Sequence, residues 1–175
     1  MTVQNSAVQA FLLITPENQG APVCQRLRAS PPVVWAAQAY GPHPVIAYAS
    51  AACQDGLSEY VESLRNDPAV RAIDARMCKH IPGDEELSPL ELIGPELAVL
   101  LINVNYEIEK ERIVSYRLRE NCRVKLARAM WGPADIIALV EAPDHESMRN
   151  LICDEIKVMK GVATNTTLYC YPGSC

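Results

Sequence analysis

The sequence predicts an α+β fold built from two tandem copies of one small unit. Strand-like and helix-like segments recur in the same order in the two halves of the chain, as expected for an internal repeat. Prolines, glycines and acidic residues gather between the halves, where they would interrupt a strand or a helix. Each half reads as strand, helix, strand, strand, helix, strand. This order gives a four-stranded antiparallel sheet with both helices on one face.

The composition is that of a folded protein without a basic cluster that could bind nucleic acid. Apolar residues make up 49% and charged residues 21% of the 175 residues, which is ordinary for a globular chain. The formal net charge is −5, and lysine and arginine form no cluster that could hold a phosphate backbone. We therefore expect no direct binding to nucleic acid.

Neither a targeting segment nor a membrane segment is predicted. The polar stretch Met1–Gln9 lacks the basic and then apolar order of a signal peptide. The longest apolar runs are far shorter than the roughly 20 residues that cross a bilayer. We expect a cytoplasmic protein that makes no membrane contact.

Three pairs of segments carry the repeat. Ala10–Ile14 matches Ala98–Ile102. Tyr40-Gly41-Pro42 matches Trp131-Gly132-Pro133, and an apolar run follows each of these two tripeptides. The strand that ends at Cys78 matches the strand that ends at Cys170. One such match could arise by chance, whereas three matches in the same order indicate a repeat.

The first copy is predicted to occupy residues 1–81. Its expected strands are Ala10–Thr15, Val33–Tyr40, Val45–Ala51 and Ala72–Ile81. A short helix is expected over Pro22–Arg28, because proline near the first turn costs no hydrogen bond. The second helix, roughly Gly56–Asn66, is predicted by the apolar stripe of Leu57, Tyr60, Val61 and Leu64.

The second copy is predicted to occupy residues 97–175. Its expected strands are Leu97–Asn105, Arg123–Met130, Asp135–Ala142 and Thr164–Tyr171. Helical propensity predicts a helix over Glu107–Glu120. A second helix should begin at Asp144, which can cap it, and run to about Met159, with Gly161 closing its end. The apolar stripe of this helix is Met148, Leu151, Ile152, Ile156 and Met159.

Residues 82–96 are predicted to form a linker across the surface. Four large apolar residues in it, Leu87, Leu90, Leu92 and Ile93, would form an unusual exposed patch. A self-complementary patch of this kind favours a homo-oligomer with a two-fold axis. The alternative is that these residues fold back onto their own subunit.

The predicted strands are apolar on both sides. Ala10–Ile14, Ala98–Ile102 and Ile136–Val140 show none of the alternation expected when one sheet face meets water. The face that the helices leave open must therefore be covered. The economical arrangement is a pseudo-dimer of two ferredoxin-like units with facing sheets, of the dimeric α+β barrel type.

The second copy resembles the effector-binding (RAM) domain of the Lrp/AsnC family. The residues that carry the likeness are Ala98–Ile102, Gly132-Pro133-Ala134-Asp135, Asp144, Lys160-Gly161-Val162 and the threonine-rich strand from Thr164. The first copy departs from the pattern, since Pro44 stands where Asp135 would be. Asp67-Pro68-Ala69-Val70 also lacks the glycine.

The resemblance implies a stand-alone sensing module without a helix-turn-helix. It implies a small-molecule ligand, with an amino acid as the expected class, bound where subunits meet. A DNA-binding relative is a further partner to consider.

The residues themselves leave two interpretations of the candidate ligand site open. Backbone N–H groups of the turn at Gly132 could hold a carboxylate, and Asp135 could take an ammonium group. The same residues could simply form a hairpin turn. Thr164, Thr166 and Thr167 could offer hydroxyls to a ligand, or could be ordinary strand residues.

Other reactive residues form no recognisable motif in the sequence. His43, His80 and His145 stand apart, and His145 is expected to be exposed. The seven cysteines contain no C-x-x-C pair and are expected to be reduced and mostly buried. Trp35 and Trp131 are expected to fill the core, although they could line a pocket. No metal or cofactor is expected.

Three functions remain open at this stage. The first is a non-enzymatic module that binds an amino acid. The second is a small enzyme of the dimeric α+β barrel type that uses His43 or His80 on an organic substrate held between the sheets. The third is a purely structural partner that co-assembles with a DNA-binding relative.

Overall fold

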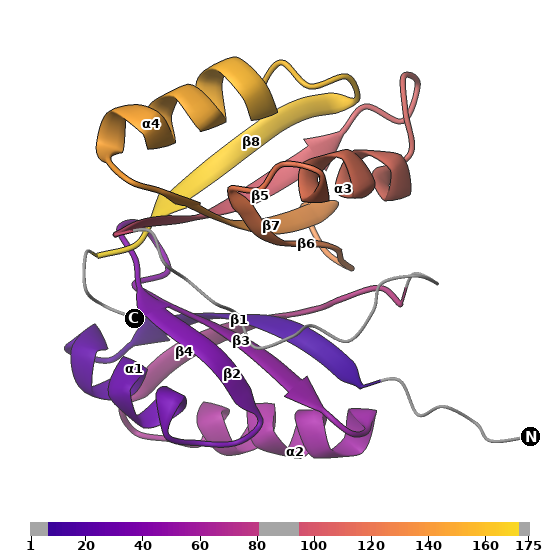
Figure 1. The fold of residues 1–175 in the computed structure, drawn as a ribbon. Helices are drawn as coiled ribbons and strands as arrows, with labels where there is room; N and C mark the ends of the chain where they lie inside the picture. Colours follow the sequence, from indigo (N-terminus) through magenta and orange to yellow (C-terminus); the bar gives the residue numbers. More distant parts are fainter. Residues whose placement is uncertain (1–6, 81–94, 172–175) are drawn as a thin grey trace, which may run out of the picture. The chain divides into compact units, whose positions relative to one another are not determined.

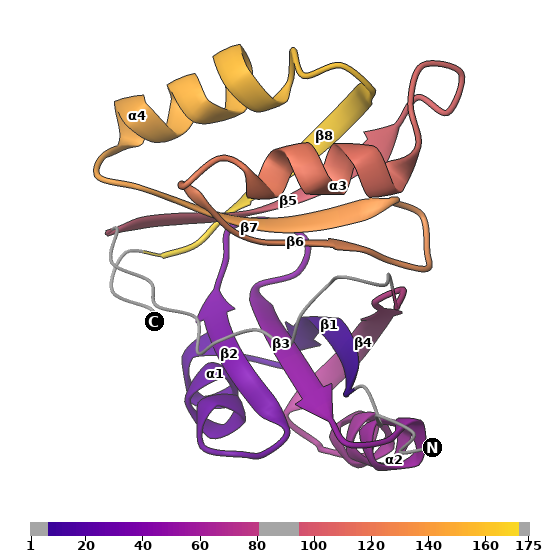
Figure 2. The ribbon, with the colours of Figure 1, turned by 45° about the vertical axis from the view of Figure 1, so that its right-hand side comes forward.

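The computed structural model describes residues 7–80 and 95–171. The described chain divides into two units, one ending at Cys78 and one that holds Lys79, His80 and the residues from Pro95 onward. Each unit has a four-stranded antiparallel sheet (Figure 1). In each unit the helices cover one face of that unit's sheet (Figure 2).

The first unit follows the predicted order of elements. Its elements are β1 (Val8–Pro16), α1 (Gly20–Arg28), β2 (Val33–Gln38), β3 (Val45–Ala51), α2 (Gln54–Arg65) and β4 (Val70–Met77). The strand order in the sheet is β2-β3-β1-β4, and every neighbouring pair is antiparallel.

The second unit has the same topology. Its elements are β5 (Glu96–Val104), α3 (Glu111–Arg119), β6 (Val124–Ala129), β7 (Ile136–Ala142), α4 (His145–Asn150), the π-helical segment η1 (Leu151–Ile156) and β8 (Val162–Tyr169). The strand order is β6-β7-β5-β8, again antiparallel throughout.

The two sheets share their irregularities as well as their strand order. The pairing of β1 with β4 shifts register at Pro16, and the pairing of β5 with β8 shifts at Val104. The strand that comes second in the chain order of each unit also shifts its register once, after Val33 in β2 and after Val124 in β6. The predicted α+β class with two βαββαβ units is confirmed.

Apolar residues on both faces of the sheets are buried. Ala10, Leu12 and Ile14 belong to the core that β1 shares with α1 and α2. The residues between them, Phe11 and Leu13, point to the opposite face and are equally buried. The missing alternation therefore reflects burial on both faces, and the facing of the two sheets stays a prediction.

All four predicted helices have different ends in the structure, and the largest differences lie in the second unit. The helix expected from Glu107 begins at Glu111, because the chain forms a turn at Asn105 first. The Asn105 side chain accepts a hydrogen bond from Glu107 N, and the Asn105 carbonyl accepts one from Glu109 N. The helix expected to reach Met159 ends at Ile156, because turns follow and lead to Gly161.

Two expectations about side-chain burial are wrong. Trp131 lies in the β6–β7 turn and is 67% exposed, whereas Trp35 is buried in β2 as expected. None of the six cysteines in the described part of the chain forms a disulfide, and only Cys24 and Cys170 among them are buried. The expected linker patch of Leu87, Leu90, Leu92 and Ile93 lies outside the described residues, while Glu96 belongs to β5.

Candidate functional site

The turn between β6 and β7 places Gly132 and Asp135 together. Met130 N donates to the carbonyl of Asp135 at 2.9 Å, which closes the turn. Gly132 has φ 142°, a conformation that side-chain-bearing residues rarely adopt. In the first unit Gly41 has φ 121° and Ala39 N donates to Pro44 O at 2.9 Å, so the two turns are built alike.

Asp135 joins its turn to the end of β5. Its Oδ2 accepts a hydrogen bond of 2.8 Å from Val104 N, and its Oδ1 accepts one of 2.7 Å from the Tyr106 hydroxyl. Its backbone N donates to Ile102 O at 3.0 Å. The carboxylate is therefore held in a fixed position beside the segment that follows β5.

A series of contacts links Asp135 to four more side chains, of which the sequence analysis named only Trp131, as a residue that could line a pocket. The Tyr106 hydroxyl also contacts Glu111 Oε2, and Glu111 Oε1 pairs with Lys79 Nζ at 2.7 Å. Lys79 Nζ lies 4.6 Å from the ring centre of Trp131, as in a cation–π contact. We call Lys79, Tyr106, Glu111, Trp131 and Asp135 the Asp135 cluster.

The Tyr106 hydroxyl faces more acceptors than it can satisfy. A phenol carries one hydrogen and donates it to one acceptor at a time, yet two carboxylates converge on this oxygen. Partial burial raises the pKa of Tyr106, and the hydrogen bonds to Glu111 and Asp135 raise the pKa further. The phenol thus stays protonated, and Lys79 is the one positive side chain in the cluster beside its two carboxylates.

The Asp135 cluster is open to solvent on its aromatic side. Tyr106 is 55% exposed, and the exposed Trp131 lies at the other end of the cluster. The first unit has no counterpart of the central carboxylate, because Pro44 occupies the turn position of Asp135. Exposed aromatic faces beside carboxylates are suited to a cation.

The three predicted threonines do not lie on one face of the sheet. Thr164 and Thr166 pair with Asn103 and Leu101 and are exposed, and Thr164 Oγ1 accepts from Asn103 Nδ2 at 3.0 Å. Thr167 pairs with Leu100, a core residue, and so points to the helix-covered face. Only Thr164 and Thr166 could serve a common ligand.

The remaining candidate residues lie apart from the Asp135 cluster. His43 is half-buried in the β2–β3 turn, and its Nδ1 is buried without a hydrogen-bond partner. His80 is exposed, and so is His145, whose ring lies 5.6 Å from that of Tyr169. Within residues 7–80 and 95–171, no three His, Cys, Asp or Glu side chains form a group that could hold a metal ion.

No helix in the described part of the chain is long and apolar enough to cross a membrane.

Comparisons with known proteins show the fold. No protein-family model matches the chain, and no curated protein does. The solved structure of TA0507, provisionally assigned as a chlorite dismutase, has 10% identity over 95% of each chain and a TM-score of 0.58. A chlorite dismutase variant from Candidatus Nitrospira defluvii has 11% identity, covers 97% of this chain and 93% of its own, and has a TM-score of 0.55.

A third structure is similar over a smaller part. The transcriptional regulator NMB0573 from Neisseria meningitidis, solved with L-Met, has 14% identity, covers 69% of this chain and 75% of its own, and has a TM-score of 0.40. A similarity of this size carries no conclusion about the present chain. The two chlorite dismutase similarities show a shared α+β fold and nothing about activity.

Proposed function

We propose that the chain is a non-enzymatic regulatory module that binds a small molecule carrying an ammonium group, with an amino acid as the expected ligand. The binding site is the Asp135 cluster, and Gly132 provides the backbone of its turn. The observation that carries the proposal is the convergence of two carboxylates on the Tyr106 hydroxyl, together with the Lys79 ammonium group that pairs with Glu111 and lies over the exposed Trp131 ring.

The charge of the Asp135 cluster favours an ammonium ligand. Asp135 and Glu111 bring two negative charges, and Lys79 neutralises one of them. The single hydrogen of the Tyr106 hydroxyl can serve only one of the two carboxylates at a time. An ammonium group carries three N–H donors and could therefore donate to both. Charge-assisted hydrogen bonds of this kind are stronger than neutral ones.

Lys79 already demonstrates the type of contact the ligand would make. Its ammonium group lies over Trp131 and pairs with Glu111. A ligand ammonium could either take the Asp135 side of the cluster or displace Lys79 from the indole. Thr164 and Thr166 remain proposed contacts for the ligand, while Thr167 would act only through the packing of β8.

A thermal-shift screen across the amino acids tests this proposal. A ligand that binds the folded state alone raises the melting temperature in proportion to its affinity and concentration. We expect one amino acid, or a small chemically related group, to raise it. No shift with any amino acid at millimolar concentration would refute the proposed ligand class.

Asp135→Asn tests the proposed site. The amide oxygen can still accept from Val104 N–H, while the charge that would meet the ammonium group is lost. We expect the affinity to fall about tenfold or more, since one charge-assisted contact is worth at least that factor. Asp154→Asn removes an exposed carboxylate from the same unit and should leave the affinity unchanged.

A further inference from the structure

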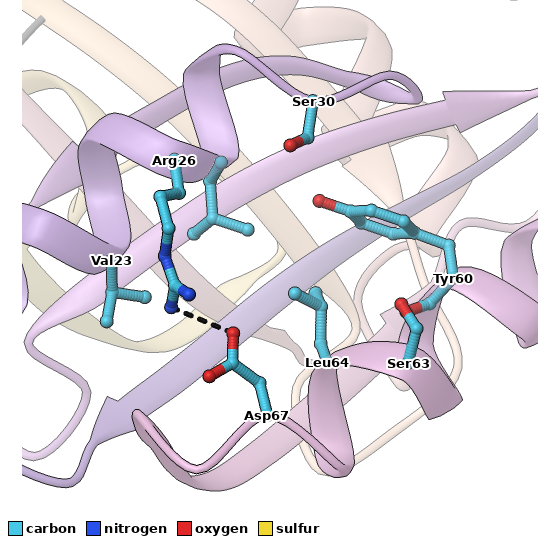
Figure 3. A pocket seen from close by; sticks show the side chains of 8 residues that line it. Val23, Arg26, Ser30, Tyr60, Ser63, Leu64 and Asp67 are labelled. Carbon is cyan, nitrogen blue, oxygen red and sulfur yellow. Dashed lines mark hydrogen bonds and ion pairs between the residues drawn. The ribbon is translucent and has the colours of Figure 1, made fainter.

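We propose that the first unit carries a second small-molecule site, a pocket between α1 and α2 that takes a small apolar carboxylate. Figure 3 shows the side chains that line the pocket. Its volume is about 190 Å³. It is separate from the Asp135 cluster, and the proposal does not depend on the function assigned to that cluster.

Apolar side chains form the inner wall of the pocket. Val23 and Leu27 come from α1 and are buried, and Leu64 comes from α2. The volume is many times the space that one water molecule occupies. It is smaller than typical pockets for drug-sized ligands, so the pocket suits a compact metabolite.

Hydroxyl groups enter the pocket from both sides. The Tyr60 ring extends from α2 across the opening toward Ser30, which follows α1 (Figure 3). The Tyr60 hydroxyl is buried and has no hydrogen-bond partner. A buried donor without a partner is costly, so this position lacks an acceptor. Burial raises the pKa of Tyr60 more than the nearby charge of Arg26 lowers it, and the hydroxyl therefore remains a donor.

The charged pair at the rim also leaves donors in excess. Arg26 Nη2 pairs with Asp67 Oδ2 at 2.8 Å, and Asp67 Oδ1 accepts from Ala69 N at 2.8 Å. Both oxygens of Asp67 are thus engaged, while the guanidinium of Arg26 has five N–H donors in a planar fork. Arg26, Tyr60 and Ser30 together offer donors, and a carboxylate is the complementary group.

The second unit fills the corresponding place with its own side chains. Val70 pairs with Pro16 and Val162 pairs with Val104, so Met159 takes the position of Asp67, three residues before the valine. Met159 packs against the core of its unit. Arg117 on α3 pairs with Glu109 and donates to Lys160 O. The pocket chemistry therefore belongs to the first unit.

The test uses 4-methylpentanoate as the probe and follows it by calorimetry and by amide chemical shifts of the full chain. We expect binding at millimolar concentration or tighter, with shifts on α1 and α2. Tyr60→Phe removes only the unpartnered hydroxyl and should weaken binding about tenfold without lowering the melting temperature. Arg26→Gln should weaken binding further.

A matched control separates the pocket from general charge effects. Arg65 lies on α2 in a solvent-exposed pair with Glu62 and does not line the pocket. Arg65→Gln should therefore leave the affinity for 4-methylpentanoate unchanged. No binding at tens of millimolar would overturn the proposal. So would equal affinity in Tyr60→Phe, or chemical shifts confined to the Asp135 cluster.

Titration with leucine and with 4-methylpentan-1-ol identifies the group that is recognised. We expect the acid to bind more tightly than both, because the alcohol lacks the charge and leucine brings an ammonium group toward Asp67, whose oxygens are engaged. Tighter binding of the alcohol than of the acid would contradict a carboxylate site.

Discussion

Asp144 fixes the first turn of α4 through one side-chain contact. Its Oδ1 accepts a hydrogen bond of 2.7 Å from Ser147 N, and its backbone is extended as in an N-cap. The first N–H groups of a helix have no partner within the helix, so a capping carboxylate satisfies one of them. The hydrogen bonds from Ser147 lower the pKa of Asp144 below its ordinary value of 3.8.

The stability contributed by Asp144 should therefore depend on pH. Because the folded-state pKa is lower than the unfolded one, the contribution is complete above about pH 4 and is lost as the pH falls through the folded-state pKa. Asp144→Ala should lower the melting temperature at neutral pH and make less difference at strongly acidic pH. Thermal unfolding followed by circular dichroism across acidic pH measures this.

Two further variants check the cause. Asp144→Asn keeps an acceptor for Ser147 N–H and should lose less stability than Asp144→Ala at neutral pH. Asp154→Asn, an exposed acid in η1, should change little. If Asp144→Ala were as stable as the parent chain at neutral pH, the cap would contribute nothing.

At the scale of the elements, the turn before β8 is tightly constrained at Gly161. Gly161 has φ 94°, and a Cβ atom there would lie 2.7 Å from Glu109 Cβ and 2.8 Å from Val114 Cγ2. Asn105 N also donates to Gly161 O at 2.8 Å, which ties the turn to the end of β5. Glycine at position 161 therefore lets the turn align β8 beside β5 without strain.

Gly161→Ala should therefore destabilise the protein by about 2–4 kcal/mol. The left-handed backbone costs about 1–2 kcal/mol for alanine, and overpacking adds a similar amount. Urea unfolding measures the loss. Gly56→Ala is the opposite control, because Gly56 lies inside α2 and its Cβ would meet only Cys53 Sγ at 3.6 Å. That change should stabilise by up to about 1 kcal/mol.

An unchanged stability of Gly161→Ala would contradict the predicted loss. If Gly161→Ala unfolded at the urea concentration of the parent chain, the turn would have room to relax. Glu109 would then have to move away from β8, since its Cβ is the nearest atom.

At the scale of the whole molecule, the net charge disfavours binding to nucleic acid. The net charge is −5, and acidic residues outnumber basic ones by 21 to 16. Many basic side chains are also already paired, among them Arg26, Lys79 and Arg117. Nucleic-acid binding depends on neutralising phosphates with lysine and arginine.

We therefore predict no measurable binding of the isolated chain to duplex DNA. A mobility-shift assay at moderate salt should show no complex at micromolar protein concentration. A shift of submicromolar affinity that weakens with added salt would contradict the prediction. If the chain does not bind DNA, any regulatory action on a gene would require a second protein that does.

The order of the elements was determined by the sequence alone, because it depends on short-range patterns. The apolar run of β3 predicts Val45–Ala51, the range found in the structure. Asp144 was predicted as a cap, because a cap depends on its own neighbours in the chain. Gly132 was predicted in a hairpin turn for the same reason. Gly161 was predicted to close the helix that Asp144 caps, but the helix ends at Ile156, and Gly161 follows later with φ 94°.

The partners of each candidate residue were decided only by the tertiary structure. Tyr106 and Glu111 join Asp135, and Arg26 joins Asp67, across separations in the chain that no local pattern reports. Burial of aromatic residues is a general preference, yet Trp131 is exposed because its turn projects beyond the sheet's paired residues. Local propensity fixes where strands and helices form, whereas strand register and the path of the chain between them determine which side chains meet.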